Sequence, residues 1–368
     1  MHEAACALCA AGEGLFPVTI RILTVVGARP QFIKAAAVSR AIRETDGVDE
    51  VMVHTGQHFD ADMSDVFFHE LDIPAPKHRL NINGGGHGEM TGRMLAALEP
   101  VLMAEKPDWL VVYGDTNSTL AGALAAAKLH IPIAHVEAGL RSFNRRMPEE
   151  VNRVLTDHLS SLHLCPTRTA VENLAKEGVR NGVHLIGDVM YDATLFAIRQ
   201  AQTGSSILSG LGLEPKKYGV ATVHRAENTD DPRRLGAVIG FLQQQATSGP
   251  VVLPIHPRTR QKAEQMGIGF EGLKVIGPVG YLDMARLLNG SNAVFTDSGG
   301  LQKEAYFHRV PCTTLRDETE WVETITHGWN RLWMGPDFAA RSDIDEYGDG
   351  RAAFRVVQLL GTTNAAAA

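Results

Sequence analysis

The chain has 368 residues, of which 44% are hydrophobic and 21% charged, and its formal net charge is −7. This length suits two α/β domains better than one hydrophobic core, and the composition is typical of a soluble protein. A net negative chain is not expected to bind nucleic acid, although a few arginines and helix N-termini suffice to hold one diphosphate. Because no apolar run approaches the ~20 residues of a membrane span, we expect a cytoplasmic protein that does not associate with membranes.

The two ends of the chain carry little that predicts structure. Residues 1–20 are alanine-rich and are predicted to form a disordered N-terminal extension, and residues 356–368 are predicted to form a tail. Cys6 and Cys9 form a C-x-x-C pair, but a zinc site needs a second pair of ligands and none lies nearby. We therefore expect no metal and a reduced, cytosolic protein.

Between the ends, short β-branched runs alternate with longer helical periods. In the first half, strands are predicted over 20–26, 50–55, 109–113 and 132–136, and helices over 32–43 and 118–129. The rhythm restarts after a strand at 183–186. The later strands are predicted over 218–223, 251–255, 274–276 and 293–296, and the later helices over 232–247, 281–289, 301–308 and 350–360.

Continuous apolar strands separated by helices indicate parallel sheets that are covered on both faces. We therefore predict an α/β fold of two doubly wound Rossmann-like domains, over 21–190 and 191–355, facing a central cleft. The last helix is expected to pack back on the first domain. Residues 267–272 match G-x-G-x-x-G literally, but they follow a helix and precede a strand, which is the reverse of a dinucleotide site. We interpret them as a connecting loop and expect no redox cofactor.

Charged residues gather where the predicted strands of the first domain end. Arg29 and Lys34 lie at a helix start and suit a diphosphate, or they are ordinary surface charges. Asp115 ends a later strand beside residues that commonly cap helices, so a structural and a functional role both fit. Glu137 ends the next strand. Glu149 lies in the first turn of a helix, where a negative charge interacts favourably with the helix dipole. Interleaved arginines are compatible with a solvated salt-bridge network, but the placement at strand ends favours carboxylates that converge on one edge of the sheet.

The second domain offers an anion site. The turn Ser298–Gly300 lies between a strand and a helix that carries Glu304. Glycines let backbone N–H groups approach phosphate oxygens, and the helix dipole adds attraction. Glu304 can accept hydrogen bonds from both hydroxyls of a ribose. A tight strand–helix turn with a buried acid would have the same sequence pattern.

Seven motifs together resemble the non-hydrolysing UDP-N-acetylglucosamine 2-epimerases, and they run in that family's order from about residue 22 to residue 335. The motifs are Gly27–Lys34 (GARPQFIK), Thr55–His58 (TGQH), Gly114–Thr119 (GDTNST), His135–Ser142 (HVEAGLRS), Pro148–Arg153 (PEEVNR), His224–Asn228 (HRAEN) and Asp297–Glu304 (DSGGLQKE). The resemblance implies a glycosyltransferase-B architecture, no cofactor and a homodimer.

The resemblance also implies roles for individual residues. Asp115, Glu137 and Glu149 become the acid and base carboxylates, assisted by Arg29 and His224. The implied UDP site consists of Arg29, Lys34, His224, Ser298, Gly299, Gly300 and Glu304. The residues implied for the sugar, or for a second, activating UDP-sugar, are Gln57, His58, Arg141, Arg225 and His256.

The sequence departs from the common pattern of the family at several places. Gln31 stands where many members have Glu, and the loop Phe143–Met147 is shorter than in the commonest members. The glycine-rich run 84–88, the basic residues of 141–147 and the segment 315–321 resemble a branch that acts on UDP-2,3-diacetamido-2,3-dideoxy-glucuronate. An arginine near the C6 carboxylate of such a sugar makes physical sense.

The predicted activity is the interconversion of UDP-N-acetylglucosamine and UDP-N-acetylmannosamine, for cell-surface polysaccharide synthesis. The route is elimination of UDP to a 2-acetamidoglucal, followed by re-addition. The uronate branch leaves the exact sugar open. The same motifs are also compatible with a hydrolysing 2-epimerase, a glycosyltransferase of the same architecture or a non-enzymatic nucleotide-sugar sensor.

Overall fold

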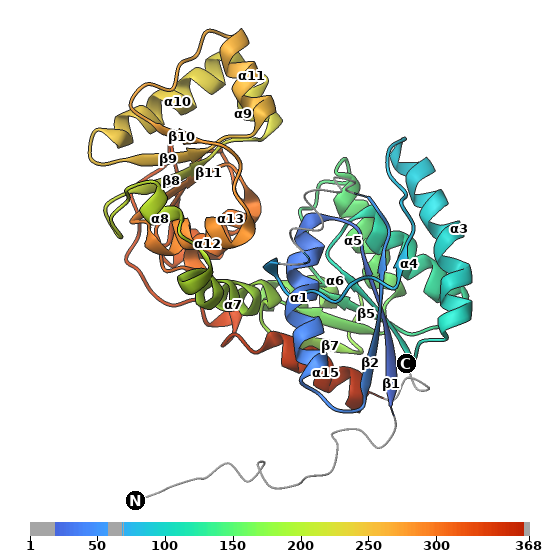
Figure 1. Ribbon diagram of the computed structural model, residues 1–368. Helices are drawn as coiled ribbons and strands as arrows, with labels where there is room; N and C mark the ends of the chain where they lie inside the picture. Colours follow the sequence, from blue (N-terminus) through green and yellow to red (C-terminus); the bar gives the residue numbers. More distant parts are fainter. Residues whose placement is uncertain (1–18, 58–67, 69, 364–368) are drawn as a thin grey trace, which may run out of the picture. The chain divides into compact units, whose positions relative to one another are not determined.

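The computed structural model describes residues 19–57, 68 and 70–363, and it divides the chain into two compact units (Figure 1). Unit 1 comprises Met1–Ser64, Asp72–Gly187 and Arg351–Ala368, and unit 2 comprises Asp65–Leu71 and Asp188–Gly350. The division falls three residues before the predicted one at 190. Most of the predicted N-terminal extension lies outside the described residues, and Ile20 already belongs to the first strand.

Unit 1 is built on a seven-stranded sheet in the order β3-β2-β1-β4-β5-β6-β7, and each neighbouring pair is parallel. Its strands are β1 (Ile20–Val26), β2 (Val48–His54), β3 (His78–Arg79), β4 (Trp109–Tyr113), β5 (Ile133–Val136), β6 (Leu162–Cys165) and β7 (Val183–Leu185). Its helices are α1 (Arg29–Arg43), α3 (His87–Glu105), α4 (Asn117–Lys128), α5 (Pro148–Leu159), α6 (Arg168–Lys176) and α15 (Ala352–Thr362).

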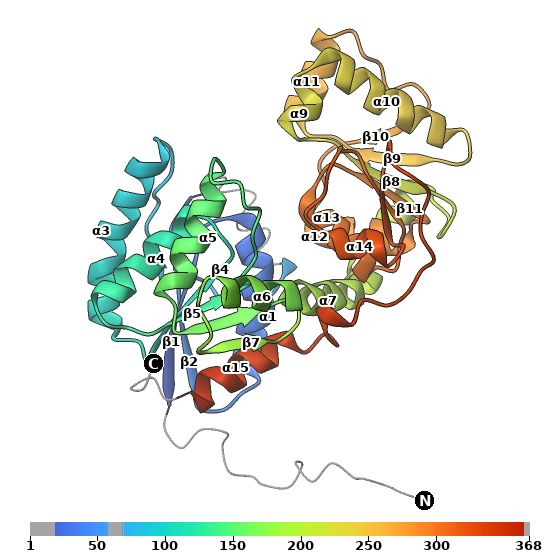
Figure 2. The ribbon, with the colours of Figure 1, turned by 180° about the vertical axis from the view of Figure 1, so that it is seen from behind.

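Helices cover both faces of this sheet (Figures 1 and 2). On one face α4 packs between α3 and α5, and on the other α15 packs against α1. All of β4 is buried, as expected for the central strand of a parallel sheet covered on both sides. Alanines of α4, such as Ala123 and Ala126, are fully buried and let this helix approach the sheet closely.

The last helix extends into residues that were predicted to form a tail. Residues up to Thr362 are helical, and Val356, Val357 and Leu360 are buried on one face of α15. Arg355 donates a hydrogen bond to the carbonyl oxygen of Ile186 at 3.0 Å. This helical segment therefore belongs to unit 1, and its packing on α1 confirms that the chain returns to the first domain.

Unit 2 contains a six-stranded parallel sheet in the order β10-β9-β8-β11-β12-β13. Its strands are β8 (Gly219–Thr222), β9 (Val251–Pro254), β10 (Lys274–Ile276), β11 (Ala293–Thr296), β12 (Cys312–Thr314) and β13 (Asn330–Leu332). Its helices are α7 (Val189–Gly204), α8 (Ile207–Gly210), α9 (Ala226–Thr229), α10 (Pro232–Ala246), α11 (Pro257–Gln265), α12 (Tyr281–Gly290), α13 (Gly299–Phe307) and α14 (Val322–Thr326), with a 3₁₀ turn, η1, at Asp345–Tyr347. Residues 267–272 connect α11 to β10, which confirms that they are a loop and not a dinucleotide motif.

The order of strands reverses at one point in each sheet. In unit 1 the chain leaves β1 toward β2 and later returns to β4 on the other side of β1, and in unit 2 the same happens at β8 and β11. Loops that follow such a pair of strands diverge to opposite faces, and this opening is where doubly wound folds bind ligands. The predicted motifs after 26, 113, 223 and 296 follow these four strands.

Gln31 joins the two loops at the switch point of unit 1. Its Oε1 accepts hydrogen bonds from the backbone N–H groups of Gly27 and Ala28 at 2.8 and 3.1 Å. Its Nε2 donates to the carbonyl oxygen of Tyr113 and to Oγ1 of Thr119, both at 2.9 Å. The side chain is buried, and in this chain its amide both accepts and donates, so all four hydrogen bonds are satisfied.

We expect the isosteric change Gln31→Glu to destabilise the fold by about 1–3 kcal/mol, because the ionised carboxylate has no hydrogen for the Tyr113 carbonyl oxygen. Burial disfavours the charged form, so the pKa of the new carboxyl is raised in the folded state. The loss should therefore be smaller near pH 5 and grow toward pH 8, as measured by urea unfolding at both pH values. The exposed Gln244→Glu is the matched control. Equal stability of the two variants at pH 8 would contradict this role.

Candidate active site

A buried ion pair lies at the switch point of unit 1. Glu137, directly after β5, forms it with Nζ of Lys34 from α1, and the two side chains are 11% and 9% exposed. Glu137 has a left-handed backbone, with φ 72°, which is unusual for a residue with a side chain. A Cβ on Gly114 would lie 3.3 Å from the Glu137 carboxylate and 3.4 Å from Lys34 Nζ. The pair is thus packed directly on the glycine that follows β4.

Two residues of α5 hold Asp115 in place. Arg153 pairs with its carboxylate, and Asn152 donates to its backbone oxygen at 2.9 Å. Burial opposes the charge of Arg153, but the carboxylates of Asp115 and Glu150 outweigh it and raise the pKa of this guanidinium. Asp115 keeps 31% of its side chain exposed, so it remains accessible while its orientation is fixed.

The two adjacent acids of α5 have different surroundings. Glu149 is exposed in the first turn of the helix. Glu150 is buried and accepts hydrogen bonds from the N–H and hydroxyl of Ser142 and from the N–H of Phe143, each at 2.9 Å. Burial alone would raise the pKa of Glu150, but these hydrogen bonds and the charge of Arg153 lower it. Glu150 therefore holds the loop before α5 in place. This role was not predicted from the sequence.

The other predicted residues of unit 1 are distributed around the same loops. Arg29 is exposed at the first position of α1. Oε1 of Gln57 accepts hydrogen bonds from the N–H and the hydroxyl of Ser118 at 3.0 and 2.8 Å, at the start of α4. His58 lies outside the described residues.

Arg141 differs most from its prediction. Its side chain is 1% exposed, and its guanidinium donates to the carboxylates of Asp157 and Glu177 and to the carbonyl oxygen of Leu140. Burial opposes its charge, but the two carboxylates raise its pKa. A guanidinium that is enclosed in this way cannot contact a sugar. Arg141 therefore has a structural role and is not a residue of the substrate site. The HVEAGLRS motif gave no means of separating it from the exposed arginines of the following loop.

Asp297 organises the matching loops of unit 2. This buried carboxylate accepts hydrogen bonds from the backbone N–H groups of His224 and Arg225, both at 3.0 Å, and from Nδ2 of Asn228 at 3.1 Å. Burial would raise its pKa, but the hydrogen bonds and charge of His224 and the amide donors lower it. The His224 ring stays 53% exposed, with Nδ1 at 3.1 Å from Asp297. The loop after β8 is therefore fixed while its imidazole is accessible.

The glycine turn begins α13. Gly300 is exposed, and a Cβ built on it meets no atom within 4 Å. Gly299 is buried, and a Cβ there would approach Oε1 of Glu320 to 2.3 Å. Ser298 precedes the helix without capping it through its side chain, and Glu304 is half-buried one turn later. His256 caps α11 by accepting the N–H of Arg258 at 3.2 Å, and its ring is exposed.

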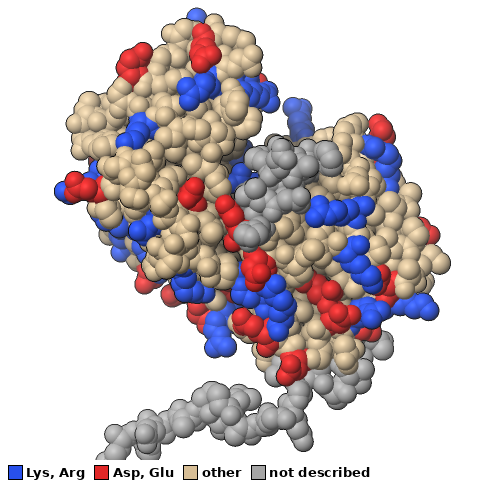
Figure 3. All heavy atoms as spheres, in the orientation of Figure 1, with Lys and Arg blue, Asp and Glu red and all other residues tan. Residues whose placement is uncertain are grey.

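Acidic and basic side chains are interspersed on the face drawn in Figure 3. Among the described residues, no group of His, Cys, Asp and Glu has the arrangement of a metal site. Within the same residues, no helix combines the length and the apolar character needed to cross a bilayer.

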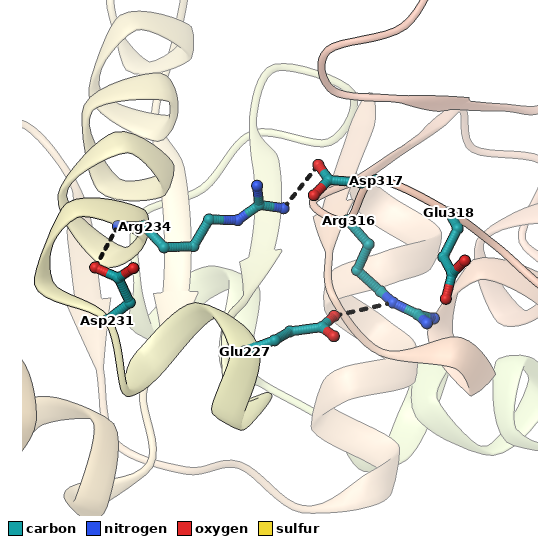
Figure 4. Close-up of a pocket in the computed structure, with 6 residues that line it drawn as sticks. All are labelled: Glu227, Asp231, Arg234, Arg316, Asp317 and Glu318. Atoms are coloured by element: carbon teal, nitrogen blue, oxygen red, sulfur yellow. Dashed lines mark hydrogen bonds and ion pairs between the residues drawn. The ribbon is translucent and has the colours of Figure 1, made fainter. Parts of the chain in front are cut away.

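Unit 2 also contains an open pocket of about 390 Å³ whose lining is charged (Figure 4). It is lined by Glu227, Asp231, Arg234, Arg316, Asp317 and Glu318. Arg234 pairs with Asp317 at 3.0 Å, and Arg316 pairs with Glu227 at 3.1 Å. Arg316 also binds Glu320, the residue beside Gly299, at 2.9 Å. These arginines were not predicted as site residues, although Arg316 lies in the segment 315–321, which resembles the uronate branch of the family.

The fold and these loops define a class of protein, the two-domain α/β proteins with a glycosyltransferase-B-like architecture. Residues 40–361 match the family described as UDP-N-acetylglucosamine 2-epimerase, and the chain belongs to this family. It is 52% identical to the UDP-2,3-diacetamido-2,3-dideoxy-D-glucuronate 2-epimerase of Pseudomonas aeruginosa, over 93% of this chain and 99% of that protein. It is 40% identical to the UDP-N-acetylglucosamine 2-epimerase of Methanocaldococcus jannaschii, over 93% of this chain and 99% of that protein.

Solved structures agree with this assignment. The crystal structure of the M. jannaschii enzyme in complex with UDP-GlcNAc and UDP matches with a TM-score of 0.82 and 39% identity, over 94% of this chain and all of that chain. The enzyme from Neisseria meningitidis bound to UDP-GlcNAc matches with a TM-score of 0.83 and 29% identity, with the same coverage. The resemblance stated from the motifs is therefore confirmed at the level of family and fold.

Proposed function

We propose that the protein is a non-hydrolysing epimerase that inverts C2 of a UDP-linked 2-acetamido sugar by eliminating UDP and adding it back. The observation that carries this is the set of carboxylates at Asp115, Glu137 and Glu149, each held at a strand end or helix start of unit 1, in a chain of this family. The proposal assigns proton transfer to these carboxylates. It assigns binding of the UDP diphosphate to Arg29 and to the turn Ser298–Gly300.

Elimination of UDP makes the hydrogen at C2 of the sugar acidic enough to be removed. The C2–H bond is not next to a carbonyl group, so a base alone cannot remove this proton. As the C1–O bond breaks, its electron pair leaves with UDP and positive charge develops at C1, which acidifies C2–H. A carboxylate takes the proton, and the C–H electrons form the C1=C2 double bond of a glycal. An acid then protonates C2 from the opposite face, and a UDP oxygen bonds to C1 again.

The surroundings of the acids support a division of roles. Lys34 pairs with Glu137, and Arg153 pairs with Asp115, so each of these carboxylates has a cation beside it. Glu149 is exposed to solvent in the first turn of α5. We propose that Glu137 or Asp115 removes the proton and that a second carboxylate of the set returns it. His224 and Glu304 complete the proposed nucleotide site, on the diphosphate and the ribose.

We propose the uronate rather than UDP-N-acetylglucosamine as the preferred substrate. Identity to the P. aeruginosa diacetamido-glucuronate epimerase is 52%, against 49% to a relative from Methanococcus maripaludis named a UDP-N-acetylglucosamine 2-epimerase homolog and 40% to the M. jannaschii enzyme. Arg145 and Arg146, both exposed, precede Glu149 in the loop before α5. A guanidinium there would pair with a C6 carboxylate, which UDP-N-acetylglucosamine lacks. We further propose a cytoplasmic homodimer that requires no cofactor and makes precursors of cell-surface polysaccharide.

Epimerisation in D₂O tests the elimination route. We expect the product, and substrate recovered at equilibrium, to carry deuterium at C2, because the proton removed exchanges with solvent before the other face is protonated. Proton NMR of the C2 signal measures this directly. Protium retained at C2 through complete epimerisation would exclude the route, and accumulation of free UDP with the free sugar would identify a hydrolysing enzyme instead.

Removing the charge of Glu137 tests its part in proton transfer. Glu137→Gln should lower kcat by ~100-fold or more, since an amide is neither an acid nor a base here. The exposed Glu99→Gln on α3 is the control and should keep wild-type kcat. UDP binding and the thermal transition of both variants report whether the fold is intact. A folded Glu137→Gln protein that turns over at the wild-type rate would remove Glu137 from the chemistry.

Substrate choice is tested by kcat/KM for the two sugars. We expect the diacetamido-uronate to be preferred by about 10–100-fold, the size of one charge-assisted contact of about 1.5–3 kcal/mol. The double variant Arg145→Ala/Arg146→Ala should lose this preference and leave kcat/KM for UDP-N-acetylglucosamine unchanged. Arg180→Ala, an exposed arginine elsewhere in unit 1, is the control. Equal losses on both sugars would show that the loop does not read the carboxylate.

A further inference from the structure

A buried cluster lies beneath the loops that carry Asp115 and Glu137. It consists of His135, Gly139, Arg141 and Asp157, and we call it the Asp157 cluster. Nδ1 of His135 lies 2.6 Å from one carboxylate oxygen of Asp157. The other oxygen accepts the N–H of Gly139 at 3.1 Å and pairs with Arg141 at 2.7 Å. His135 and Asp157 have no exposed side-chain surface.

The second nitrogen of His135 reaches the other loop. Its Nε2 lies 2.7 Å from the carbonyl oxygen of Gly114, the residue before Asp115. A carbonyl oxygen and an ionised carboxylate only accept hydrogen bonds. Both ring nitrogens of His135 therefore face acceptors, and they can donate to both only if each carries a hydrogen.

The neighbouring histidine shows the contrast. His163 is paired with His135 in the register of β5 and β6. Its Nε2 donates to the backbone oxygen of Asp157 at 2.8 Å, while its Nδ1 is buried and has no hydrogen-bond partner in the described structure. Burial lowers the pKa of His163, so this ring is neutral. Burial also opposes the charge of Asp157, but His135 and Arg141 outweigh it and lower its pKa, so Asp157 is ionised.

The cluster fixes backbone that cannot relax elsewhere. Gly139 has φ 80°, and a Cβ there would meet the carbonyl oxygen of Ala170 at 2.3 Å. Glu137 lies between His135 and Gly139, both of which Asp157 holds, and it is itself in the left-handed region. Gly114 is held by His135 and packs on the Glu137 carboxylate. One carboxylate therefore ties together the loops after β4 and β5.

We infer that Asp157, acting through the His135 imidazolium, is a positioning residue that sets Asp115 and Glu137 relative to each other for proton transfer. This inference rests on the proposed function. It assigns Asp157 no contact with substrate, and it predicts that loss of the charge affects the chemical step and not the binding of the nucleotide.

Asp157→Asn is the test, because the amide keeps the shape and removes the charge and one acceptor. We expect kcat to fall about 10–100-fold, the effect of a small misplacement of reacting groups. KM and the Kd for UDP should stay within about threefold of wild type, since a loss confined to the chemical step leaves binding unchanged. Glu177→Gln is the matched control, because it removes the other carboxylate on Arg141 without touching His135 or Gly139, and it should keep wild-type kcat. If Asp157→Asn fails to fold, as judged by its thermal transition, His135→Gln replaces it with the same expectations. A folded Asp157→Asn protein that has lost UDP binding would contradict the inference.

Nitrogen-15 NMR of histidine-labelled protein gives a second readout that does not depend on turnover. The His135 signals, assigned by their loss in His135→Gln, should show both ring nitrogens protonated in the wild type and a neutral ring in Asp157→Asn. A neutral His135 in the wild type, unchanged kcat in Asp157→Asn, or an equal loss in Glu177→Gln would overturn the inference. A wild-type protein that binds UDP but epimerises neither sugar would instead refute the proposed function, while the NMR result still decides the state of His135.

Discussion

The structure of the candidate site depends on one close approach, the packing of the Lys34–Glu137 ion pair on the backbone of Gly114. A side chain at Gly114 would press on the Glu137 carboxylate and touch Lys34, and its φ of 61° favours glycine in any case. A buried ion pair contributes little net stability, because the cost of removing two charges from water offsets their attraction. Its presence at the switch point of a doubly wound sheet therefore points to function.

The parallel sheets explain why these charges meet. β1, β4 and β5 are neighbours and all point the same way. Gly114 and Glu137, in the loops after β4 and β5, therefore lie at the same edge of the sheet as the start of α1, which carries Lys34. In unit 2, β8 and β11 bring Asp297 under the loop of His224 in the same manner. Each unit thus uses its own switch point, with carboxylates on unit 1 and a glycine turn on unit 2.

Much of this arrangement was predictable from the sequence. Strands such as 20–26, 109–113 and 293–296 were predicted to the residue, because continuous apolar runs with sharp polar ends leave little choice of boundary. The motifs identified the strand-end residues in the correct order. The short strand β6 and the long helix α3 were not predicted, and α3 contains Gly88, Gly92 and Pro100, which are unfavourable inside a helix. The last helix was predicted over 350–360 and is observed over Ala352–Thr362, so the tail predicted from residue 356 begins inside this helix.

What the sequence could not separate is which of several similar charged residues is buried. Arg141 and Arg145 belong to one basic segment, yet one is enclosed between two carboxylates and the other is exposed. Glu149 and Glu150 are adjacent, yet a helix turns them about 100° apart, so one faces solvent and the other faces the loop that it holds. Burial of this kind depends on contacts with residues far along the chain.

A single device recurs in both units: a buried carboxylate collects donors from the loop that carries the accessible groups. Asp157 does this beneath the loop of Glu137, and Asp297 does it beneath the loop of His224. Removing each carboxylate from water costs several kcal/mol, so it persists only where the surrounding donors compensate fully. Most of those donors are backbone N–H groups and side chains of the site loops. The hydrogen bonds that compensate the buried charge are therefore the same ones that hold the loops rigid. Proton transfer tolerates misplacement of about half an ångström, and loops held in this way can meet that demand without help from bound ligand.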